Sequence, residues 1–218
     1  SRGLGDVYKR QLEGSNHDFG ADIIPRLIDT QSVYAYKFCG SKGRVDKDCY
    51  WRDVGTIDSF YQANMDLLEP VPPMNLYQPN WAIRTYEAQY PPARTVSSAT
   101  GNEGIFINSI IANGVINSGG SVQHSIIASN VRIQDSATVV DSIIFDDVEV
   151  GEGCQLVSCI VDKHVRVPPH TQIGINKIED TKRFHVSEKG IVVIPEDYEF
   201  WWFIQVFTRC NTKTLNPV

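Results

Sequence analysis

The residues Trp51, Arg52 and Asp53 place an aromatic ring, a cation and a carboxylate next to one another in the chain. Such a run could bind a polar ligand or a metal ion. A single Asp beside an Arg, without further context, is more typical of an ion pair in a loop. The chemistry of this run therefore depends on the elements that surround it.

A second set of reactive side chains, His124, His164 and His170, lies in or next to an internal repeat. Between Asn108 and Gly174 the same sequence pattern of about seventeen residues occurs four times. The repeat opens with Ser109-Ile110-Ile111, Ser125-Ile126-Ile127, Ser142-Ile143-Ile144 and Cys159-Ile160-Val161. Its second apolar column is Val115, Val131, Val148 and Val165, and its third is Val122, Val139, Leu156 and Ile173.

Three apolar columns per repeat, roughly six residues apart, are the signature of a hexapeptide-repeat parallel β-helix. We expect the column residues to point inward and to stack on their equivalents one turn away. Small or polar residues occupy the predicted corners, for example Asn113-Gly114, Asp146-Asp147 and Gly153. Pro168-Pro169 also falls at a corner, where a missing N–H has little effect.

Some hexapeptide coils are acyltransferases or zinc enzymes that use histidines, so the three histidines require a test. A zinc site needs three imidazoles at about 2.0–2.1 Å from one metal ion. In the repeat register, His124 precedes Ser125, His164 precedes Val165, and His170 follows Pro169. They fall in different columns, so we do not expect them to converge within one chain.

The composition excludes several classes of protein. A net charge of −6 with dispersed basic residues argues against binding to nucleic acid. The longest apolar run, Phe200 to Phe207, is too short to span a bilayer. Five cysteines without a CxxC pair predict free thiols in a reducing cytoplasm (Cys39, Cys49, Cys154, Cys159 and Cys210).

The first half reads as the closing part of an α/β domain. Residues 21–28 have helical spacing, and Pro25 is tolerated there in the first turn. Residues 32–38 alternate like a strand. Residues 50–56 form a predicted loop before a helix over 57–68, which Thr56 caps and whose dipole suits Asp58.

The two ends do not fit the rest of the sequence. Residues 1–11 resemble a translated adapter, and residues 199–207 are dense in aromatics. The predicted organisation is an adapter-like segment at 1–11, the end of the α/β domain at 12–70, a proline-rich linker at 71–100, the β-helix at 101–176 and a C-terminal segment at 177–218.

Several motifs together resemble bacterial glucose-1-phosphate adenylyltransferases. They are His17–Gly20, Tyr50–Thr56, Asn80–Tyr86, Asp180–Phe184 and Gly190–Ile194, and the resemblance covers roughly residues 15–196. In that family a nucleotidyltransferase domain precedes a left-handed parallel β-helix. The resemblance therefore implies a mainly β chain, with that β-helix following the C-terminal remnant of an α/β nucleotidyltransferase domain.

The resemblance also implies a reaction in glycogen biosynthesis, in which ATP and glucose 1-phosphate give ADP-glucose and pyrophosphate. Mg²⁺ would be the cofactor, with Asp53 as a catalytic residue and one of two carboxylate ligands. Two interpretations of Trp51 and Arg52 stay open. In one, Trp51 anchors the core and Arg52 is a surface charge; in the other, both residues shape the sugar-phosphate pocket. His17 and Asp18 are expected to hold the loop before a helix.

The family's glycine-rich phosphate loop, its other metal aspartate and its sugar-phosphate lysine have no counterpart in residues 12–70. We therefore expect the isolated chain to have no turnover. Lys163 resembles a basic effector contact, although a solvated corner charge is equally compatible. Glu196 stands where relatives commonly carry a basic residue, which puts the inherited effector specificity in doubt.

The family is typically a cytoplasmic homotetramer. Three alternatives stay open: a transferase for another base or sugar, a non-catalytic regulatory homologue, and a hexapeptide-repeat acyltransferase. The first is the nearest, because base and sugar are chosen largely in the half that has no counterpart here. An intact Asp53 counts against the second.

Overall fold

A computed structural model describes residues 18–35, 50–74, 76–77, 86 and 88–200. The chain separates into two compact units, residues 1–43 and residues 44–218. The predictions for residues 1–11, His17 and residues 201–207 lie outside the described residues, as does almost all of the motif Asn80–Tyr86.

The described part of the first unit contains one helical segment. It begins with the π-helical turn η1 (Phe19–Ile23) and continues as α2 (Ile24–Thr30). Asp18 caps it, because its Oδ1 accepts a hydrogen bond from the N–H of Ala21 at 2.6 Å. Pro25 lies in the first turn of α2, as predicted.

The strand predicted over residues 32–38 is wrong for residues 32–35, which have no regular secondary structure. A strand is held by hydrogen bonds to a neighbouring strand, and alternation of residue types alone does not supply one. No strand is present in the described part of this unit. The remaining residues of the predicted strand lie outside the description.

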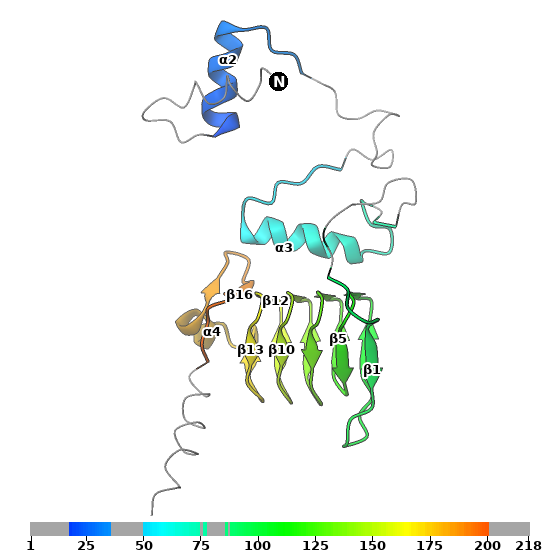
Figure 1. The fold of residues 1–218 in the computed structure, drawn as a ribbon. Helices are drawn as coiled ribbons and strands as arrows, with labels where there is room; N and C mark the ends of the chain where they lie inside the picture. Colours follow the sequence, from blue (N-terminus) through cyan, green and yellow to red (C-terminus); the bar gives the residue numbers. More distant parts are fainter. Residues whose placement is uncertain (1–17, 36–49, 75, 78–85, 87, 201–218) are drawn as a thin grey trace, which may run out of the picture. The chain divides into compact units, whose positions relative to one another are not determined.

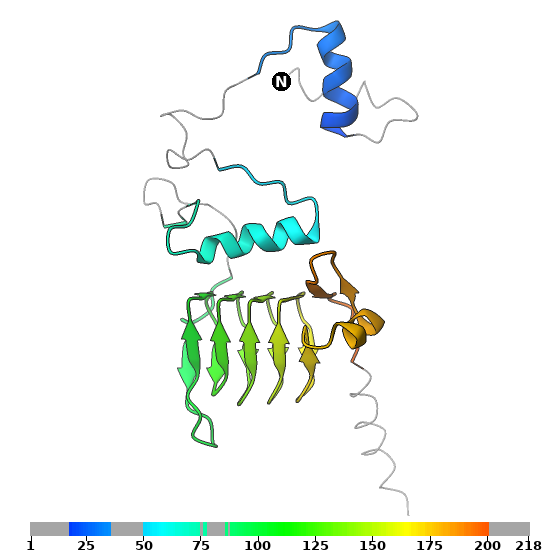
Figure 2. The ribbon, with the colours of Figure 1, turned by 180° about the vertical axis from the view of Figure 1, so that it is seen from behind.

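The second unit is dominated by a parallel solenoid of three sheets (Figures 1 and 2). One sheet contains β1 (Arg94–Val96), β4 (Ile116–Ser118), β7 (Arg132–Ile133), β10 (Glu149–Val150) and β13 (Arg166–Val167). Another contains β2 (Ile105–Ile107), β5 (Ser121–Gln123), β8 (Thr138–Val140), β11 (Gln155–Val157) and β14 (Gln172–Ile173). The third contains β3 (Ile110–Ile111), β6 (Ile126–Ile127), β9 (Ile143–Ile144), β12 (Cys159–Val161), β16 (Val192–Ile194) and β15 (His185–Val186).

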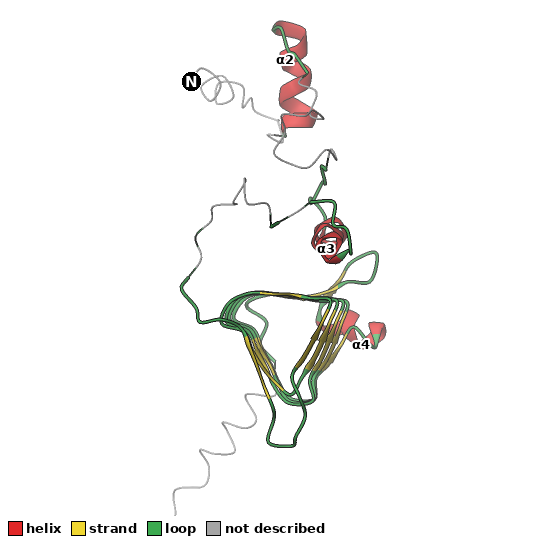
Figure 3. Cartoon of the chain, turned by 90° about the vertical axis from the view of Figure 1, so that its right-hand side faces the viewer, coloured by secondary structure: helices red, strands yellow, loops and turns green. Residues whose placement is uncertain are grey.

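Each strand pairs with its equivalent one turn away, so the register follows the repeat: Ile110 lies beside Ile126, and Ile126 beside Ile143. Viewed along the stack, the three sheets form a triangle (Figure 3). Only β15, among the described strands, is antiparallel to its neighbour. The strands β1 and β16 show that the solenoid extends on both sides of the predicted range 101–176.

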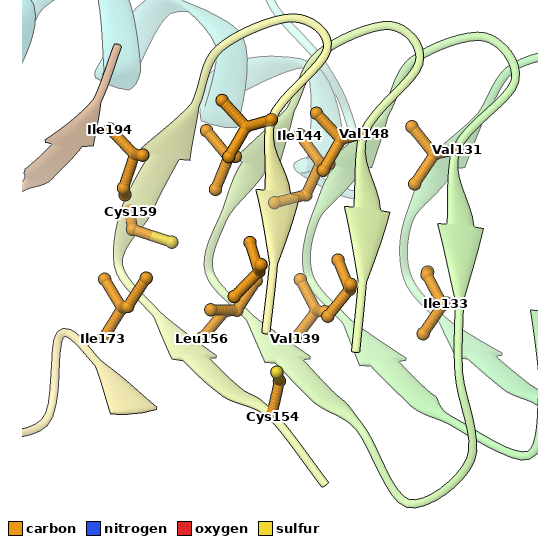
Figure 4. Packing of buried hydrophobic residues seen from close by; sticks show 14 of the residues in the cluster. Val131, Ile133, Val139, Ile144, Val148, Cys154, Leu156, Cys159, Ile173 and Ile194 are labelled. Atoms are coloured by element: carbon orange, nitrogen blue, oxygen red, sulfur yellow. The ribbon is translucent and has the colours of Figure 1, made fainter. Parts of the chain in front are cut away.

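The three apolar columns form the interior, as predicted (Figure 4). Val131, Val139 and Leu156 are fully buried. Burying one such side chain contributes about 1.5–3 kcal/mol before conformational entropy is subtracted. Cys154 and Cys159 lie in this core as free thiols, which agrees with the prediction for these two cysteines.

The corners of the triangle use left-handed backbone, which Gly, Asn, Asp and His adopt most readily. Three corner columns result: Asn108, His124, Asp141 and Ser158; Gly114, Asn130, Asp147 and His164; and Gly119, Ser136, Gly153 and His170. Each of the three histidines belongs to a different column, as predicted. Among the described residues, no group of three or more His, Cys, Asp or Glu could hold a metal ion.

Helix α4 (Lys177–Arg183) follows the last complete turn of the solenoid. Its Asp180 is buried and accepts a hydrogen bond from the N–H of Gly174 at 3.0 Å. Burial raises the pKa of the Asp180 carboxyl. Gly174 has a φ of +80°, and an added Cβ would lie 1.7 Å from the carbonyl oxygen of Val157, so this junction requires glycine.

No helix in the described ranges is both long and apolar enough to cross a membrane.

Candidate functional site

The loop of residues 50–56 leads directly into α3 (Ile57–Met65), which continues as the 3-10 turn η2 (Asp66–Leu68). Thr56 and Ser59 form a capping box: the N–H of Ser59 donates to Thr56 Oγ1, and the N–H of Thr56 donates to Ser59 Oγ, both at 3.1 Å. The predicted loop, cap and helix are confirmed. The loop is therefore fixed at one end by a well-formed helix start.

The apolar face of α3 packs on the outer face of the third sheet. In each repeat the second apolar residue of the opening packs in the interior of the solenoid, while the first belongs to the cluster beneath α3. Met65 and Leu68 are each 5% exposed. The cluster between helix and sheet comprises Ile57, Phe60, Tyr61, Met65, Leu68, Ile110, Ile126, Ile143, Phe145, Ile160, Ile191 and Val193.

Polar contacts add to this packing. The hydroxyl of Ser187 donates to Asp58 Oδ1 at 2.5 Å, and the N–H of Lys189 donates to Asp58 Oδ2 at 3.3 Å. The Tyr61 hydroxyl donates to the carbonyl oxygen of Asp141 at 2.6 Å. Burial, followed by the charge of Asp141, raises the pKa of Tyr61 to about 12. Asp58 thus binds the solenoid in addition to its predicted place at the helix dipole.

Asp53 lies on the exposed part of the loop. Its Oδ1 accepts a hydrogen bond from the N–H of Gly55 at 3.1 Å, which closes a tight turn. Within the described residues, its other oxygen has no hydrogen-bond or ion-pair partner. The carboxylate can therefore accept a hard cation while keeping its turn.

Arg52 binds Asp66 and not its neighbour Asp53. Its Nε donates to Asp66 Oδ2 at 3.1 Å, and its Nη2 donates to the same oxygen. Asp66 Oδ1 accepts from Gln62 Nε2 at 3.0 Å. Burial alone would raise the pKa of Asp66, but the hydrogen bonds of Arg52 and Gln62 hold that pKa below its usual value.

Trp51 is 75% exposed, so it is not a core anchor within the described structure. Asp66 has no role in the predictions from the sequence, although an acid between Met65 and Leu67-Leu68 is a signal that it needs a partner, since buried acids are rarely unpaired.

Lys163 lies at an exposed corner between β12 and β13, on a different element from the Asp53 loop. Its backbone N–H donates to Asp162 Oδ1 at 2.8 Å, and its ammonium forms no ion pair with a described residue. The adjacent His164 lies 3.5 Å from Asp147 Oδ2 and 3.7 Å from Glu196 Oε1. Acidic side chains therefore surround this corner.

Two family models match the chain. One, described as nucleotidyl transferase, matches residues 6–70, and the other, described as GlmU-like C-terminal hexapeptide, matches residues 91–194. The first match includes the Asp53 loop and α3, and the second matches the solenoid. The chain thus combines part of a nucleotidyltransferase with a left-handed hexapeptide β-helix, which confirms the predicted fold class.

Curated relatives carry the name glucose-1-phosphate adenylyltransferase. Glucose-1-phosphate adenylyltransferase 2 of Vibrio parahaemolyticus is 88% identical over 190 residues, which are 87% of this chain and 47% of the relative. The protein of that name from Vibrio cholerae is 78% identical over the same shares. The glucose-1-phosphate adenylyltransferase of Methylococcus capsulatus is 45% identical over 84% of this chain and 43% of its own length.

The chain belongs to the glucose-1-phosphate adenylyltransferase family, as the motifs of its sequence predict. It spans about half the length of the curated relatives it matches.

Proposed function

We propose that this chain is part of a glucose-1-phosphate adenylyltransferase, which converts ATP and glucose 1-phosphate to ADP-glucose and pyrophosphate in glycogen biosynthesis. The observation that carries the proposal is the 88% identity to a relative of that name over 87% of the chain. The intact run Tyr50–Thr56, with an available carboxylate at Asp53, supports it.

The reaction exchanges one phosphorus–oxygen bond for another. A phosphate oxygen of glucose 1-phosphate attacks the α-phosphorus of ATP. A new P–O bond forms, and the bond from the α-phosphorus to the oxygen bridging it to the β-phosphorus breaks. Pyrophosphate leaves with the electron pair, so no oxidant or reductant is needed.

Asp53 fits a role in holding Mg²⁺. Mg²⁺ takes oxygen ligands and usually only one or two carboxylates from the protein, and it neutralises charge on the transferring phosphate. Asp53 supplies one such carboxylate, exposed and with one oxygen unpaired among the described residues. A second carboxylate would come from outside the described residues.

The neighbours of Asp53 have separate roles in the proposal. Trp51, whose side chain is exposed, would help to form the sugar-phosphate pocket. Arg52, whose guanidinium is committed to Asp66, shapes that pocket by fixing the course of the loop and does not itself bind the substrate phosphate.

Regulation, assembly and location complete the proposal. Lys163 would contact an anionic effector, in a setting that Glu196 and Asp147 make less favourable for phosphate. The full-length enzyme would be a cytoplasmic homotetramer. No specific observation favours a transferase for another sugar or base, a regulatory homologue or an acyltransferase.

The test uses a chimaera in which the 190 aligned residues of this chain replace their counterparts in the Vibrio parahaemolyticus relative. Asp53→Asn keeps an oxygen for the N–H of Gly55 but removes the charge. We expect ADP-glucose formation to fall about 100-fold or more. Glu69→Gln, an exposed change of the same charge, is expected to leave the rate unchanged.

The reaction should also be assayed with the isolated 218-residue chain, for which we expect no ADP-glucose. A normal rate in the Asp53→Asn chimaera would remove Asp53 from the mechanism. Turnover by the isolated chain would contradict the need for a separate phosphate-binding loop.

A further inference from the structure

The Asp53 loop is attached to the solenoid through α3. Within the described residues, the loop's side-chain anchors are the local turn to Gly55, the cap of Thr56 and the ion pair between Arg52 and Asp66. The turn and the cap involve residues close in sequence. The ion pair joins residues 14 positions apart, so among the contacts of the described residues it is the one that fixes the loop against the far end of the helix.

Asp66 is a rigid anchor. Its side chain is 12% exposed, and both of its oxygens are occupied, one by Arg52 and the other by Gln62. Its neighbour Met65, like Leu68, is buried against the third sheet. A carboxylate that is nearly buried and doubly bonded on a packed helix has little freedom to move.

The helix in turn is fixed to the solenoid at several points. Asp58 binds Ser187 and Lys189, beyond the last complete turn, and Tyr61 binds Asp141 in the middle of the stack. The contacts thus run without a break from the solenoid through α3 and Asp66 to Arg52, which is the residue adjacent to Asp53.

We propose that the Arg52–Asp66 ion pair is a positioning device that holds Asp53 where it can bind the metal ion, so that the solenoid sets the geometry of this carboxylate. The inference rests on the proposed role of Asp53. Arg52 and Asp66 are positioning residues, because neither touches the reacting atoms.

The physical reason is the short distance along the backbone. Consecutive Cα atoms stay about 3.8 Å apart, so holding Arg52 limits how far the adjacent Asp53 can move. A displacement of about 1 Å in a catalytic group can lower a rate roughly 100-fold. A loop held only by the Gly55 turn and the Thr56 cap would let Asp53 sample more positions than a loop that the Arg52–Asp66 pair also restrains.

The first experiment measures the Mg²⁺ concentration that gives half the maximal rate in the chimaera. Asp66→Asn is expected to raise it about tenfold, at the lower end of the effect of residues that orient a metal ligand. Asp66→Glu should restore part of the difference. Arg52→Gln should have the same effect as Asp66→Asn, and the double variant should be no worse than either, since both remove one interaction.

The second experiment needs no activity. Trypsin cleaves after an arginine that it can reach, and Asp66 holds Arg52 in the 218-residue chain. In Asp66→Asn, cleavage between Arg52 and Asp53, followed by mass spectrometry, should be at least about fivefold faster because the loop opens locally. Glu69→Gln, with the same charge change three residues further on, should cleave at the wild-type rate.

The outcomes separate this inference from the proposed function. If Asp53→Asn leaves the chimaera's rate intact, the proposed metal role fails. If Asp53→Asn inactivates it while Asp66→Asn and Arg52→Gln both keep the wild-type Mg²⁺ requirement, the positioning inference fails and the metal role stands. Arg52 is 42% exposed, so Arg52→Gln still gives a folded protein for the test if Asp66→Asn does not.

Discussion

Helices α2 and α3 both carry an apolar stripe, yet their surroundings differ. In α2 no residue is buried, and Ile28 is 61% exposed. In α3 and its continuation η2, Met65 and Leu68 are 5% exposed beneath a cluster of solenoid isoleucines. An apolar stripe shows that a helix has a partner surface, but it does not say which one.

The partner of α3 is the outer face of the solenoid. The sequence of α3 lies within the range that the nucleotidyl transferase model matches, and a proline-rich segment separates it from the solenoid. The helix is nevertheless packed on the solenoid's outer face. Helix α3 therefore belongs in sequence to the nucleotidyltransferase part and in packing to the solenoid.

The sharpest test of this comparison places a charge on each surface. Ile143→Asp puts a carboxylate beneath α3 at a site that is 3% exposed, and we expect it to lower the free energy of unfolding by about 3–5 kcal/mol. Ile28→Asp on α2 should change it by less than about 0.5 kcal/mol. Urea unfolding of the 218-residue chain measures both. Equal effects would mean that α3 does not cover this face.

A smaller effect is expected for the hydroxyl of Tyr61. Tyr61→Phe removes the hydrogen bond to Asp141 and should lower the free energy of unfolding by about 1 kcal/mol. Tyr34→Phe, at an 88% exposed position beyond α2, should leave the free energy of unfolding unchanged. Because the pKa of Tyr61 is raised to about 12, the folded protein keeps a proton that the unfolded chain loses near pH 10.

Stability should therefore fall between pH about 10 and 12 in the wild type, and it should fall less in Tyr61→Phe. Unfolding curves at several alkaline pH values, with Tyr34→Phe as the control, report this difference. Identical alkaline profiles for the wild type and Tyr61→Phe would contradict the buried contact.

The smallest effect concerns Asp66 at acid pH. The pKa of Asp66 is lowered in the folded protein. Its carboxylate therefore adds to the free energy of unfolding above the ordinary pKa of an Asp, and this stabilisation is lost as the pH falls through the pKa of the folded state. Asp66→Asn should flatten the acid limb of the stability profile, and Glu69→Gln should not. An unchanged acid limb in Asp66→Asn would show that the pair with Arg52 does not persist in solution.

The solenoid could be predicted in detail from the sequence because each turn repeats the same side-chain pattern. The inward columns through Val131, Val139 and Ile144, and the separation of the histidines, follow from the register alone. The cap at Thr56 and the place of Pro25 could also be predicted, since they depend on residues a few positions apart.

The docking of α3 could not be predicted in this way. Asp58 and Ser187 are 129 residues apart, and no local pattern connects them. The outward-facing isoleucines, of which Ile143 is one, gave a signal that was not used: an apolar residue on the outside of a solenoid requires a cover. The strand expected at residues 32–38 failed for a related reason, because strand pairing is also non-local.

The length of α3 has a consequence for the evolution of this protein. The helix and η2 together contain nine and three residues, about 20 Å along the axis, and neighbouring strands lie about 4.8 Å apart. The helix thus matches the span of the five parallel strands of the third sheet. Repeat proteins commonly gain or lose units. An added turn here would leave one strand of the third sheet uncovered by α3 or would separate Asp58 from Ser187, so the length of α3 limits the number of turns.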